Sequence, residues 1–381
     1  MRYKLLGKSG LRVSELCLGT MTFMEGLSWG APKSESQKIY DQFVAAGGNF
    51  IDTANSYGNC EECLGEFMRA DRQRLVISTK YTGRFSGSNL PKDANAAGNH
   101  RKNMMASVET SLKHLKTDYI DLLSVHSWDF LSPVEEVMRG LDDLVRQGKV
   151  LYVGISNAPA WVVAQANTLA ELRGWTPFIS LQIEYNLLER SGDRDLIPMA
   201  RALDIGVTAW APLASGWLSG KYTRRDLSGL GQATQMKRRL DDPLAAAFVQ
   251  RNERNISIAE AVVELAAKID ATPAQVVLNW HRYQNIIPIL GIRRAEQLEE
   301  NLGCLSFTLT EGHIQQLNEV SRIKLGYPHD FLASGRVIHH VYGGMFESID
   351  NHRNPNRAAN PNSLSTQRRK VSLGYEEKFL N

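Results

Sequence analysis

The sequence predicts a (β/α)8 barrel, in which eight parallel strands close into a ring and a helix follows each strand. Short apolar runs alternate eight times along the chain with segments of helical period. Most of these runs are apolar throughout rather than at every second position, as expected of parallel strands that are covered on both faces. A doubly wound open sheet is the alternative, but no predicted strand is followed by the G-x-G-x-x-G turn typical of such sheets.

The predicted strands lie between residues 15 and 291. They are Glu15–Gly19, Asn49–Asp52, Leu75–Lys80, Tyr119–His126, Val150–Ser156, Ile179–Tyr185, Gly206–Pro212 and Ile286–Gly291. Ahead of them, Arg2–Leu5 and Leu11–Val13 flank a turn that contains two glycines. This pattern predicts a β-hairpin, which we expect to plug the floor of the barrel.

Several of the intervening helices have clear signals. The segments Ser132–Glu135 and Thr272–Gln275 both have the pattern of a capping box with proline at the first helical position. Apolar residues at helical spacing follow Ser132–Glu135, and Gly148 is expected to end that helix. A further helix before the fourth strand is predicted from one apolar face, formed by Met104, Val108, Leu112 and Leu115.

The last part of the chain differs from the rest. From about residue 326 the sequence is polar and has neither helical nor strand period. We therefore expect a barrel over residues 1–325 and an irregular C-terminal extension, loop or partly disordered, over residues 326–381.

The composition excludes several classes of protein. The chain has 381 residues, of which 43% are hydrophobic and 22% charged, and its net charge is +3, which is too small to predict nucleic-acid binding. It contains neither an apolar run long enough for a membrane span nor the apolar region of a secretory signal at its start. Four cysteines in so long a chain do not form a disulfide framework, so a cytoplasmic setting is expected.

Titratable side chains stand at the ends of three successive predicted strands. Asp52, Lys80 and His126 end the second, third and fourth strands, and Tyr57 follows the second. In a barrel of this type the carboxyl ends of the strands carry the chemistry. We therefore expect these four side chains to lie together at the mouth of the barrel.

Such a group could lower the pKa of a tyrosine. Free tyrosine titrates near 10, and proton exchange near neutrality would need a fall of roughly 2–3 units, or about 3–4 kcal/mol. One ammonium at about 4 Å supplies about 4 kcal/mol at an effective dielectric constant near 20. Lys80 could therefore suffice, with Asp52 keeping it charged and His126 bonding a substrate oxygen or assisting proton transfer. Taken singly, Asp52 and Lys80 are as well explained by a structural ion pair, and His126 and Tyr57 are better explained by core packing, but the joint pattern favours function.

These segments resemble the aldo-keto reductase superfamily, and most closely its aryl-alcohol dehydrogenase-like branch. D-T-A-x-x-Y-G at Asp52–Gly58, S-T-K at Ser78–Lys80 and V-H-S-W-D at Val125–Asp129 match its catalytic segments. The resemblance covers about residues 2–325. It implies hydride transfer between NADP(H) and a carbonyl, with Asp52, Tyr57, Lys80 and His126 as a catalytic tetrad and Tyr57 as general acid and base.

The resemblance also implies a cofactor site. Residues carried over at the first to sixth strand ends are Gly19, Thr20, Asp52, Ser156, Asn157 and Gln182, the last three for the nicotinamide carboxamide. Trp210 would stack on the nicotinamide ring. The segment Ala211–Tyr222 would bind the diphosphate, through Ala211, Pro212, Leu213, Gly216, Leu218, Gly220 and Lys221. The adenosine phosphate would lie by Gly291, Arg293, Gln297 and Asn301.

The last segment has its own physical reading. Arg293 and Arg294 follow the eighth strand and open a helix, where guanidinium groups and free backbone N–H groups favour an anion. This suits a 2′-phosphate and favours NADPH over NADH. The alternative is that both arginines only solvate a surface helix.

Other readings of the function stay open from sequence. The chain could be a cofactor-binding regulatory subunit resembling channel β-subunits, with little turnover, or a Schiff-base lyase that uses Lys80. Cys60 and Cys63 have C-x-x-C spacing and His339 adjoins His340, but neither pair completes a metal site, so no metal is expected. Long segments at Tyr81–Lys102 and Leu213–Asp242 are candidate lids. The expected partner is a small carbonyl or alcohol substrate, with neither nucleic acid nor membrane, and a homo-oligomer is an open alternative.

Overall fold

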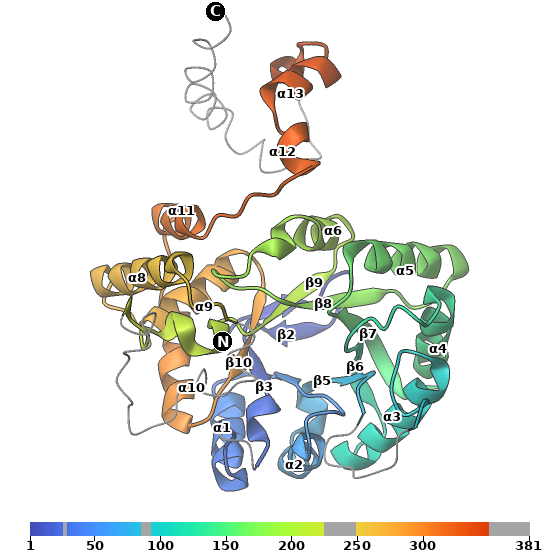
Figure 1. Ribbon diagram of the computed structural model, residues 1–381. Helices are drawn as coiled ribbons and strands as arrows, with labels where there is room; N and C mark the ends of the chain where they lie inside the picture. The colour runs from blue at the N-terminus through green and yellow to red at the C-terminus, as the bar shows by residue number, and fades with distance from the viewer. Residues whose placement is uncertain (26–28, 85–92, 225–248, 350–381) are drawn as a thin grey trace, which may run out of the picture. The chain divides into compact units, whose positions relative to one another are not determined.

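The fold is a (β/α)8 barrel, as predicted. The computed structural model describes residues 1–25, 29–84, 93–224 and 249–349. Eight parallel strands form one closed sheet in the order β10-β3-β4-β5-β6-β7-β8-β9, and the main helices surround it (Figure 1). The chain thus runs once round the ring, and the barrel closes where β10 pairs with β3.

The observed strands agree with the predicted ones to within two residues at their ends. They are β3 Cys17–Gly19, β4 Phe50–Asp52, β5 Val76–Tyr81, β6 Ile120–Val125, β7 Val150–Ser156, β8 Phe178–Glu184, β9 Gly206–Trp210 and β10 Ile287–Gly291. Glu15 lies just before the barrel wall, where its carboxylate binds Arg282 at 2.9 Å. It therefore anchors the start of β3 rather than belonging to it.

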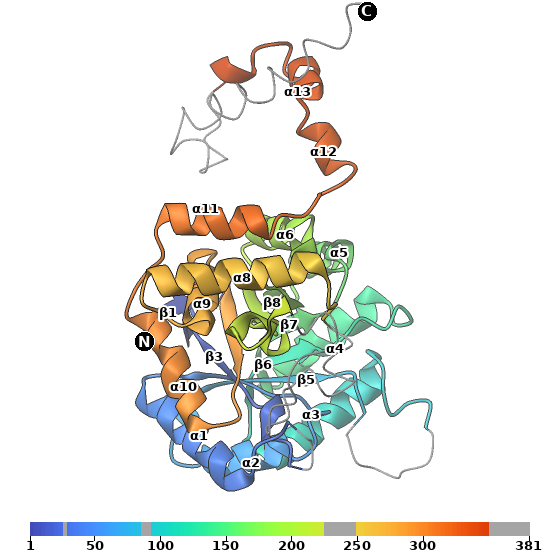
Figure 2. The same cartoon turned by 60° about the vertical axis from the view of Figure 1, so that its left-hand side comes forward.

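Ten α-helices of the described residues belong to the barrel. They are α1 Lys33–Ala45, α2 Cys60–Phe67, α3 Arg101–Leu115, α4 Val134–Arg146, α5 Ala160–Arg173, α6 Leu196–Ala202, α8 Glu253–Lys268, α9 Pro273–Tyr283, α10 Ala295–Leu302 and α11 Glu311–Val320. Short 3-10 turns are η1 Met21–Phe23, η2 Arg72–Arg74, η3 Ser191–Asp193, η4 Ala214–Ser219 and η7 Gly303–Leu305. Helices α8 and α11 lie side by side (Figure 2), so α11 completes the outer layer.

The two predicted capping boxes have different outcomes. At α9 the Thr272 side chain accepts from the Gln275 N–H and the reciprocal bond is also present, so this box is confirmed. At α4 the prediction is wrong, because Pro133 is the cap residue and no side chain caps the helix. The Ser132 hydroxyl instead donates to Asp129 Oδ2 at 2.9 Å. The Ser132 hydroxyl, which the local pattern predicts as the helix cap, is therefore bonded to the Asp129 carboxylate instead.

The N-terminal hairpin closes the floor of the barrel, as predicted. Strands β1 Tyr3–Leu5 and β2 Arg12–Ser14 pair antiparallel. Leu6 and Val13 are fully buried in a core with apolar residues from the lower parts of the barrel strands. The turn fits tightly, because a Cβ on Gly7 would lie 2.3 Å from the carbonyl oxygen of Ile179, and the Lys8 N–H donates to Asp204 O at 2.6 Å. The floor is therefore packed with apolar side chains.

The chain divides into two compact units, Met1–Ile323 and Lys324–Asn381. The second unit contains the helices α12 His329–Leu332 and α13 Gly335–Val341 and the turn η8 Phe346–Ser348, which the sequence pattern did not predict. A Ser334 side-chain cap starts α13. Residues 350–381 of the expected extension, and parts of the two candidate lids, lie outside the described residues.

Two further observations concern the chain as a whole. The cysteines Cys17, Cys60, Cys63 and Cys304 are all free and buried. Among the described residues, none of the helices is both long enough and apolar enough to cross a membrane.

Candidate active site

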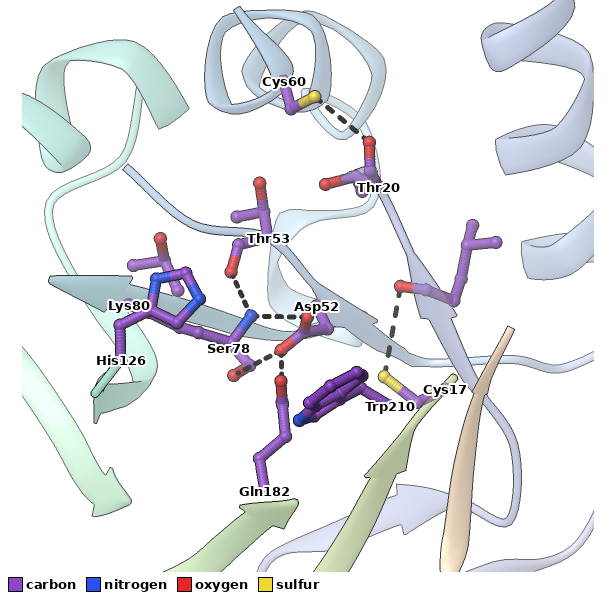
Figure 3. A network of polar contacts seen from close by, with 12 residues as sticks. Cys17, Thr20, Asp52, Thr53, Cys60, Ser78, Lys80, His126, Gln182 and Trp210 are labelled. Carbon is purple, nitrogen blue, oxygen red and sulfur yellow. Dashed lines mark hydrogen bonds and ion pairs between the residues drawn. The ribbon is translucent and has the colours of Figure 1, made fainter. Parts of the chain in front are cut away.

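The site begins with a buried ion pair at the carboxyl ends of β4 and β5. Lys80 Nζ lies 2.6 Å from Asp52 Oδ2 and donates to the Thr53 carbonyl oxygen at 2.8 Å (Figure 3). The Lys80 side chain is fully buried and Asp52 is 3% exposed. Adjacent parallel strands place the two side chains together, because Asp52 pairs with Ser78, two residues before Lys80 on the same face of β5.

The other oxygen of Asp52 is also bonded. Ser78 Oγ donates to Oδ1 at 3.3 Å, and Gln182 Nε2 donates to it at 2.9 Å from β8 (Figure 3). The carboxylate of Asp52, on β4, is therefore bonded to side chains from two other strands, β5 and β8. Burial lowers the pKa of Lys80, but the Asp52 charge and the neighbouring hydrogen bonds outweigh it, so this pKa lies above its ordinary value. The amine is cationic at neutral pH.

Tyr57 lies beside this pair, in the turn after β4. Lys80 Nζ is 5.0 Å from the centre of the Tyr57 ring. The turn is fixed by the Asn55 N–H, which donates to Lys80 O at 3.1 Å, and by the Tyr57 N–H, which donates to Ala54 O at 3.1 Å. The phenol and the amine are thus held as neighbours by the backbone that follows β4.

The expected fall in the pKa of Tyr57 is wrong. Burial raises the pKa of this phenol, the charge of Asp52 raises it further, and the Lys80 ammonium offsets only part of the rise. The Lys80 charge alone, at an intermediate dielectric constant, would lower this pKa. In the structure the carboxylate neutralises much of the lysine field, and the burial of Tyr57 disfavours the phenolate.

His126 follows β6 and faces Tyr57. The ring centres are 5.7 Å apart, with the planes inclined at 78°. Burial, and then the charge of Lys80, lower the pKa of His126 to about 3. Because the ring is neutral at physiological pH, it can bond a substrate oxygen but cannot act there as an imidazolium acid. The resting site therefore contains a carboxylate, an ammonium, a phenol and a neutral imidazole.

The next three strand ends present amides and an indole. Asn157, in left-handed backbone with φ +48°, donates from Nδ2 to His126 O at 2.9 Å. Its Oδ1 accepts from Trp210 Nε1 at 3.1 Å. Trp210 and Gln182 also lie close to Asp52 in Figure 3. The residues that the resemblance assigns to the nicotinamide thus adjoin the four titratable groups.

Two buried hydroxyls in this area fit a polar ligand. Ser156 Oγ and Thr20 Oγ1 are inaccessible to solvent and have no hydrogen-bond partner among the described residues. Buried polar groups are normally bonded, so unsatisfied ones at a strand-end site are suited to an incoming group. Ser156 ends β7 and Thr20 follows β3, which agrees with their assignment to a cofactor.

The segment after β9 has an unusual backbone. Ala211, Ala214 and Ser215 have φ values of +48°, +48° and +53°, and Gly216 has +94°. Non-glycine residues in this region are strained, and such strain tends to occur at binding sites. Leu218 is fully buried and its N–H donates to Leu213 O at 3.2 Å, so its side chain packs in the core. Lys221 is exposed, whereas Pro212 is buried.

The other glycines have packing reasons of their own. A Cβ on Gly19 would lie 2.8 Å from Ile289 Cγ2, and a Cβ on Gly220 would lie 3.0 Å from Pro273 Cγ. Gly19 therefore permits the close contact of β3 with β10, whether or not a ligand lies above it.

The eighth strand end carries the candidate phosphate site. Gly291 ends β10 and is exposed, and the Arg293 N–H donates to Gln297 Oε1 at 3.1 Å. Burial, and then the Arg294 charge, lower the pKa of Arg293, so an anion would relieve a local excess of positive charge. Asn301 is buried on α10. Glu35 accepts from the first N–H of α10 at 2.8 Å and so already uses one donor of this helix end.

Sequence reasoning missed Glu184. It pairs with Trp210 across β8 and β9 and lines a cavity of about 390 Å³ together with Asn157 and Glu189. Burial, and then the Glu189 charge, raise the pKa of Glu184 to about 7. Its position two residues after Gln182 on the same strand was the available signal, since alternate residues of a strand share a face.

Comparisons with known proteins agree with this geometry. The family model described as "Aldo/keto reductase family" matches residues 15–322. Norsolorinic acid reductase of Aspergillus flavus is 38% identical over 337 residues, covering 86% of this chain and 83% of the relative. A putative aryl-alcohol dehydrogenase of Saccharomyces cerevisiae is 36% identical, covering 88% and 91%. An aryl-alcohol dehydrogenase (NADP(+)) of Phanerodontia chrysosporium is 36% identical, covering 88% and 90%.

Proposed function

The chain belongs to the aldo/keto reductase family and is an oxidoreductase of carbonyl and alcohol groups, and we propose that it uses NADPH with Tyr57 as the proton donor. One observation carries the assignment of residues. Lys80, Asp52, Tyr57 and His126 end or follow three neighbouring strands and lie together at the carboxyl end of the barrel, the first two buried and the last two half-buried. Their placement supports a reaction in which the Tyr57 phenol donates a proton at one fixed position.

Each side chain then has a distinct task. NADPH, when bound, supplies the hydride. Tyr57 donates its phenolic proton to the carbonyl oxygen as negative charge develops there. Lys80 stabilises the phenolate that remains, because Asp52 holds the amine in its cationic form at 2.6 Å. The neutral His126 ring orients the substrate oxygen by a hydrogen bond.

The raised pKa of Tyr57 is compatible with this task. An alkoxide is a much stronger base than a phenolate, so a phenol of high pKa still protonates it. The reverse direction is different, since alcohol oxidation needs the phenolate as base. Reduction is therefore the direction that the neutral-pH protonation states favour.

The cofactor preference rests on the end of β10. We assign the carboxamide to Ser156, Asn157 and Gln182, the nicotinamide face to Trp210 and the 2′-phosphate to Arg293 with Arg294. The half-buried guanidinium of Arg293 beside a second arginine supports the phosphate assignment. The relative named for NADP(+) supports the same choice.

The substrate class follows from the relatives. Their names give aryl alcohols and norsolorinic acid. We propose aromatic aldehydes or ketones as the carbonyl substrates of this chain. A panel of aryl aldehydes, aliphatic aldehydes and ketones, followed by NADPH consumption, tests this, and preference for aliphatic substrates would contradict it.

The replacement Tyr57→Phe tests the proton donor. It removes only the hydroxyl, so NADPH affinity, measured by fluorescence titration, should stay close to that of the wild type. Turnover should fall by about 10²–10⁴-fold, the usual contribution of a general acid. Near-full activity of Tyr57→Phe would disprove the assignment.

The rival readings fare less well. A Schiff-base lyase needs a neutral, nucleophilic lysine, whereas the pKa of Lys80 is raised and its amine is bound to Asp52. A regulatory subunit with little turnover has no specific observation in its favour. Tight NADPH binding without turnover on the whole panel would revive it.

A further inference from the structure

A second polar network adjoins the backbone of His126 and contains none of the four side chains of the proposed tetrad. Asn99 stands just before α3 and is fully buried. Its Nδ2 donates to Thr82 Oγ1 at 2.8 Å and to Ser127 O at 2.9 Å. Its Oδ1 accepts from the Asp129 N–H at 2.8 Å. One side chain thus binds the residue after β5 and the segment that follows His126.

Asp129 fixes Asn99 in return. Asp129 Oδ2 accepts from the Asn99 N–H at 2.6 Å, and Oδ1 accepts from the Leu131 and Ser132 N–H groups, both at 2.9 Å. The pair therefore exchanges two hydrogen bonds between the loops after β5 and β6. We call Thr82, Asn99, Ser127 and Asp129 the Asn99 network.

Thr82 connects this network to His126. The His126 N–H donates to Tyr81 O at 2.9 Å and also approaches Thr82 Oγ1 at 3.2 Å. Thr82 has φ +119°, a backbone conformation that favours glycine and is strained for a β-branched residue. Strain of this kind persists only where the surroundings enforce it, and it gathers at functional sites. A threonine here places a hydroxyl between Asn99 and His126.

The same turn reaches Tyr57. Gly83, the neighbour of Thr82, accepts at its carbonyl oxygen from Asn55 Nδ2 at 3.0 Å. Asn55 is buried and lies two residues before Tyr57. The turn after β5 therefore contacts the backbone segments that carry both rings, which face each other at 5.7 Å.

We propose that Asn99 is a positioning residue that, through Thr82 and Ser127, holds the His126 ring in register with Tyr57. The inference rests on the proposed function for its effect on turnover. A shift of about 1 Å at such a site can cost about 10²-fold in rate. Asn99 touches no reacting group and acts through the backbone of His126.

The first test is kinetic. Asn99→Ala removes the two bonds that the amide donates and the one that it accepts from Asp129, and should lower kcat by about 10- to 100-fold. The KM for NADPH should change little, and the primary deuterium isotope effect on kcat should rise, because the chemical step becomes slower. Thr82→Val removes only the hydroxyl and should produce a smaller effect of the same kind, whereas Thr82→Ser, which keeps the hydroxyl, should restore kcat.

Asn279→Ala is the matched control. Asn279 is also buried, and its Nδ2 also bridges two carbonyl oxygens, those of Cys304 and Phe307, both at 2.8 Å. It lies on α9, outside the barrel wall. Its replacement should lower thermal stability but leave kcat and the isotope effect unchanged. Equal kinetic effects of Asn99→Ala and Asn279→Ala would show a purely structural role and overturn the proposal.

The second test does not depend on turnover. The imidazole signal of His126 is observed by NMR in protein with labelled histidine, without cofactor, and is assigned by its loss in His126→Asn. The signal should move or broaden in Asn99→Ala and Thr82→Val, but not in Thr82→Ser or Asn279→Ala. An unchanged signal in Thr82→Val and Asn99→Ala would overturn the proposal. If Asn99→Ala does not fold, Thr82→Val decides alone.

The two tests separate this inference from the proposed function. If the wild type reduces no carbonyl on the panel, the proposed function fails, while displacement of the His126 signal still supports positioning by Asn99. If Tyr57→Phe is inactive and both Asn99→Ala and Thr82→Val keep full kcat, the proposed function stands and this inference fails.

Discussion

The protonation states of single residues decide what the site can do. Asp52 is bonded to Lys80, Ser78 and Gln182. Its carboxylate therefore links the ends of three strands, β4, β5 and β8, and also pairs with the Lys80 charge. Tyr57 and His126 are both neutral at physiological pH, the first because burial raises its pKa and the second because burial lowers it. The single cationic side chain of the proposed tetrad is Lys80.

The first prediction concerns the pH dependence of reduction. Tyr57 keeps its proton to above pH 10, because its pKa is raised from the ordinary value of 10.0, and His126 does not titrate until about pH 3. The rate of carbonyl reduction should therefore show no histidine inflection between about pH 5 and 8. Alcohol oxidation should instead increase continuously into the alkaline range.

Glu184 provides the control for this profile. Its pKa of about 7 could produce an inflection near neutrality that is unrelated to the four catalytic candidates. Any such inflection should disappear in Glu184→Gln. An inflection near pH 6.5 that survives in Glu184→Gln and disappears in His126→Asn would contradict the neutral state of His126.

A second prediction at this scale concerns stability. The folded pKa of Glu184 lies above its ordinary value of 4.5. The stabilising effect of its protonated form is therefore fully present below pH 4.5 and is lost as the pH rises through about 7. Glu184→Gln should raise the unfolding temperature, relative to the wild type, more at pH 8 than at pH 4. An increase of equal size at both values would be evidence against the raised pKa.

The third prediction concerns the buried ion pair. Lys80→Met should abolish most turnover and lower the free energy of unfolding by about 3–5 kcal/mol, because it leaves the Asp52 charge buried without its partner. The double replacement Asp52→Asn with Lys80→Met should recover much of the stability but none of the activity. Denaturant titrations and NADPH assays on the two variants and the wild type check this. Recovery of activity in the double variant would refute the role of Lys80.

At the scale of single elements, the sequence predicted which strands and helices form better than it predicted how they are capped and connected. All eight strands and the capping box of α9 are read correctly, because apolar runs and local caps depend on neighbouring residues. The capping box of α4 fails because Asp129, outside the motif, competes for Ser132. The Asn99 network was not visible either, since it joins loops that meet only when β5 and β6 are paired.

The fourth prediction is made for the hairpin. Gly7→Ala puts a side chain into left-handed backbone with φ +54° and drives its Cβ into the Ile179 carbonyl. The free energy of unfolding should fall by at least about 2 kcal/mol. Gly10→Ala in the same turn is the control, because its Cβ would meet no atom within 4 Å. Equal stability of the two variants would show that the hairpin does not seal the barrel tightly.

At the scale of the whole molecule, the fold followed from the order of strands and helices, and the strand ends located the four titratable residues. Their pKa values did not follow, because these depend on burial and on charges brought together from different strands. The assignment of residues 1–325 to one barrel stays a prediction.

The fifth prediction tests this assignment. A chain that ends at residue 325 should fold with an unfolding temperature close to that of the full protein, because the first compact unit ends at Ile323. A chain that ends at residue 310 should not, because it lacks α11, whose Ile314 and Leu317 are buried in the main core. Loss of the fold in the chain of 325 residues would show that the extension is part of the barrel.

The pairing of β3 with β10 also affects how the protein is made. Leu18 pairs with Leu290 and Gly19 pairs with Gly291. The first barrel strand to leave the ribosome therefore cannot complete its pairing until the last strand has been synthesised. Until then the nascent sheet has two unpaired edge strands, which are prone to association with other chains. We therefore expect protection by chaperones to matter until residue 291 has emerged.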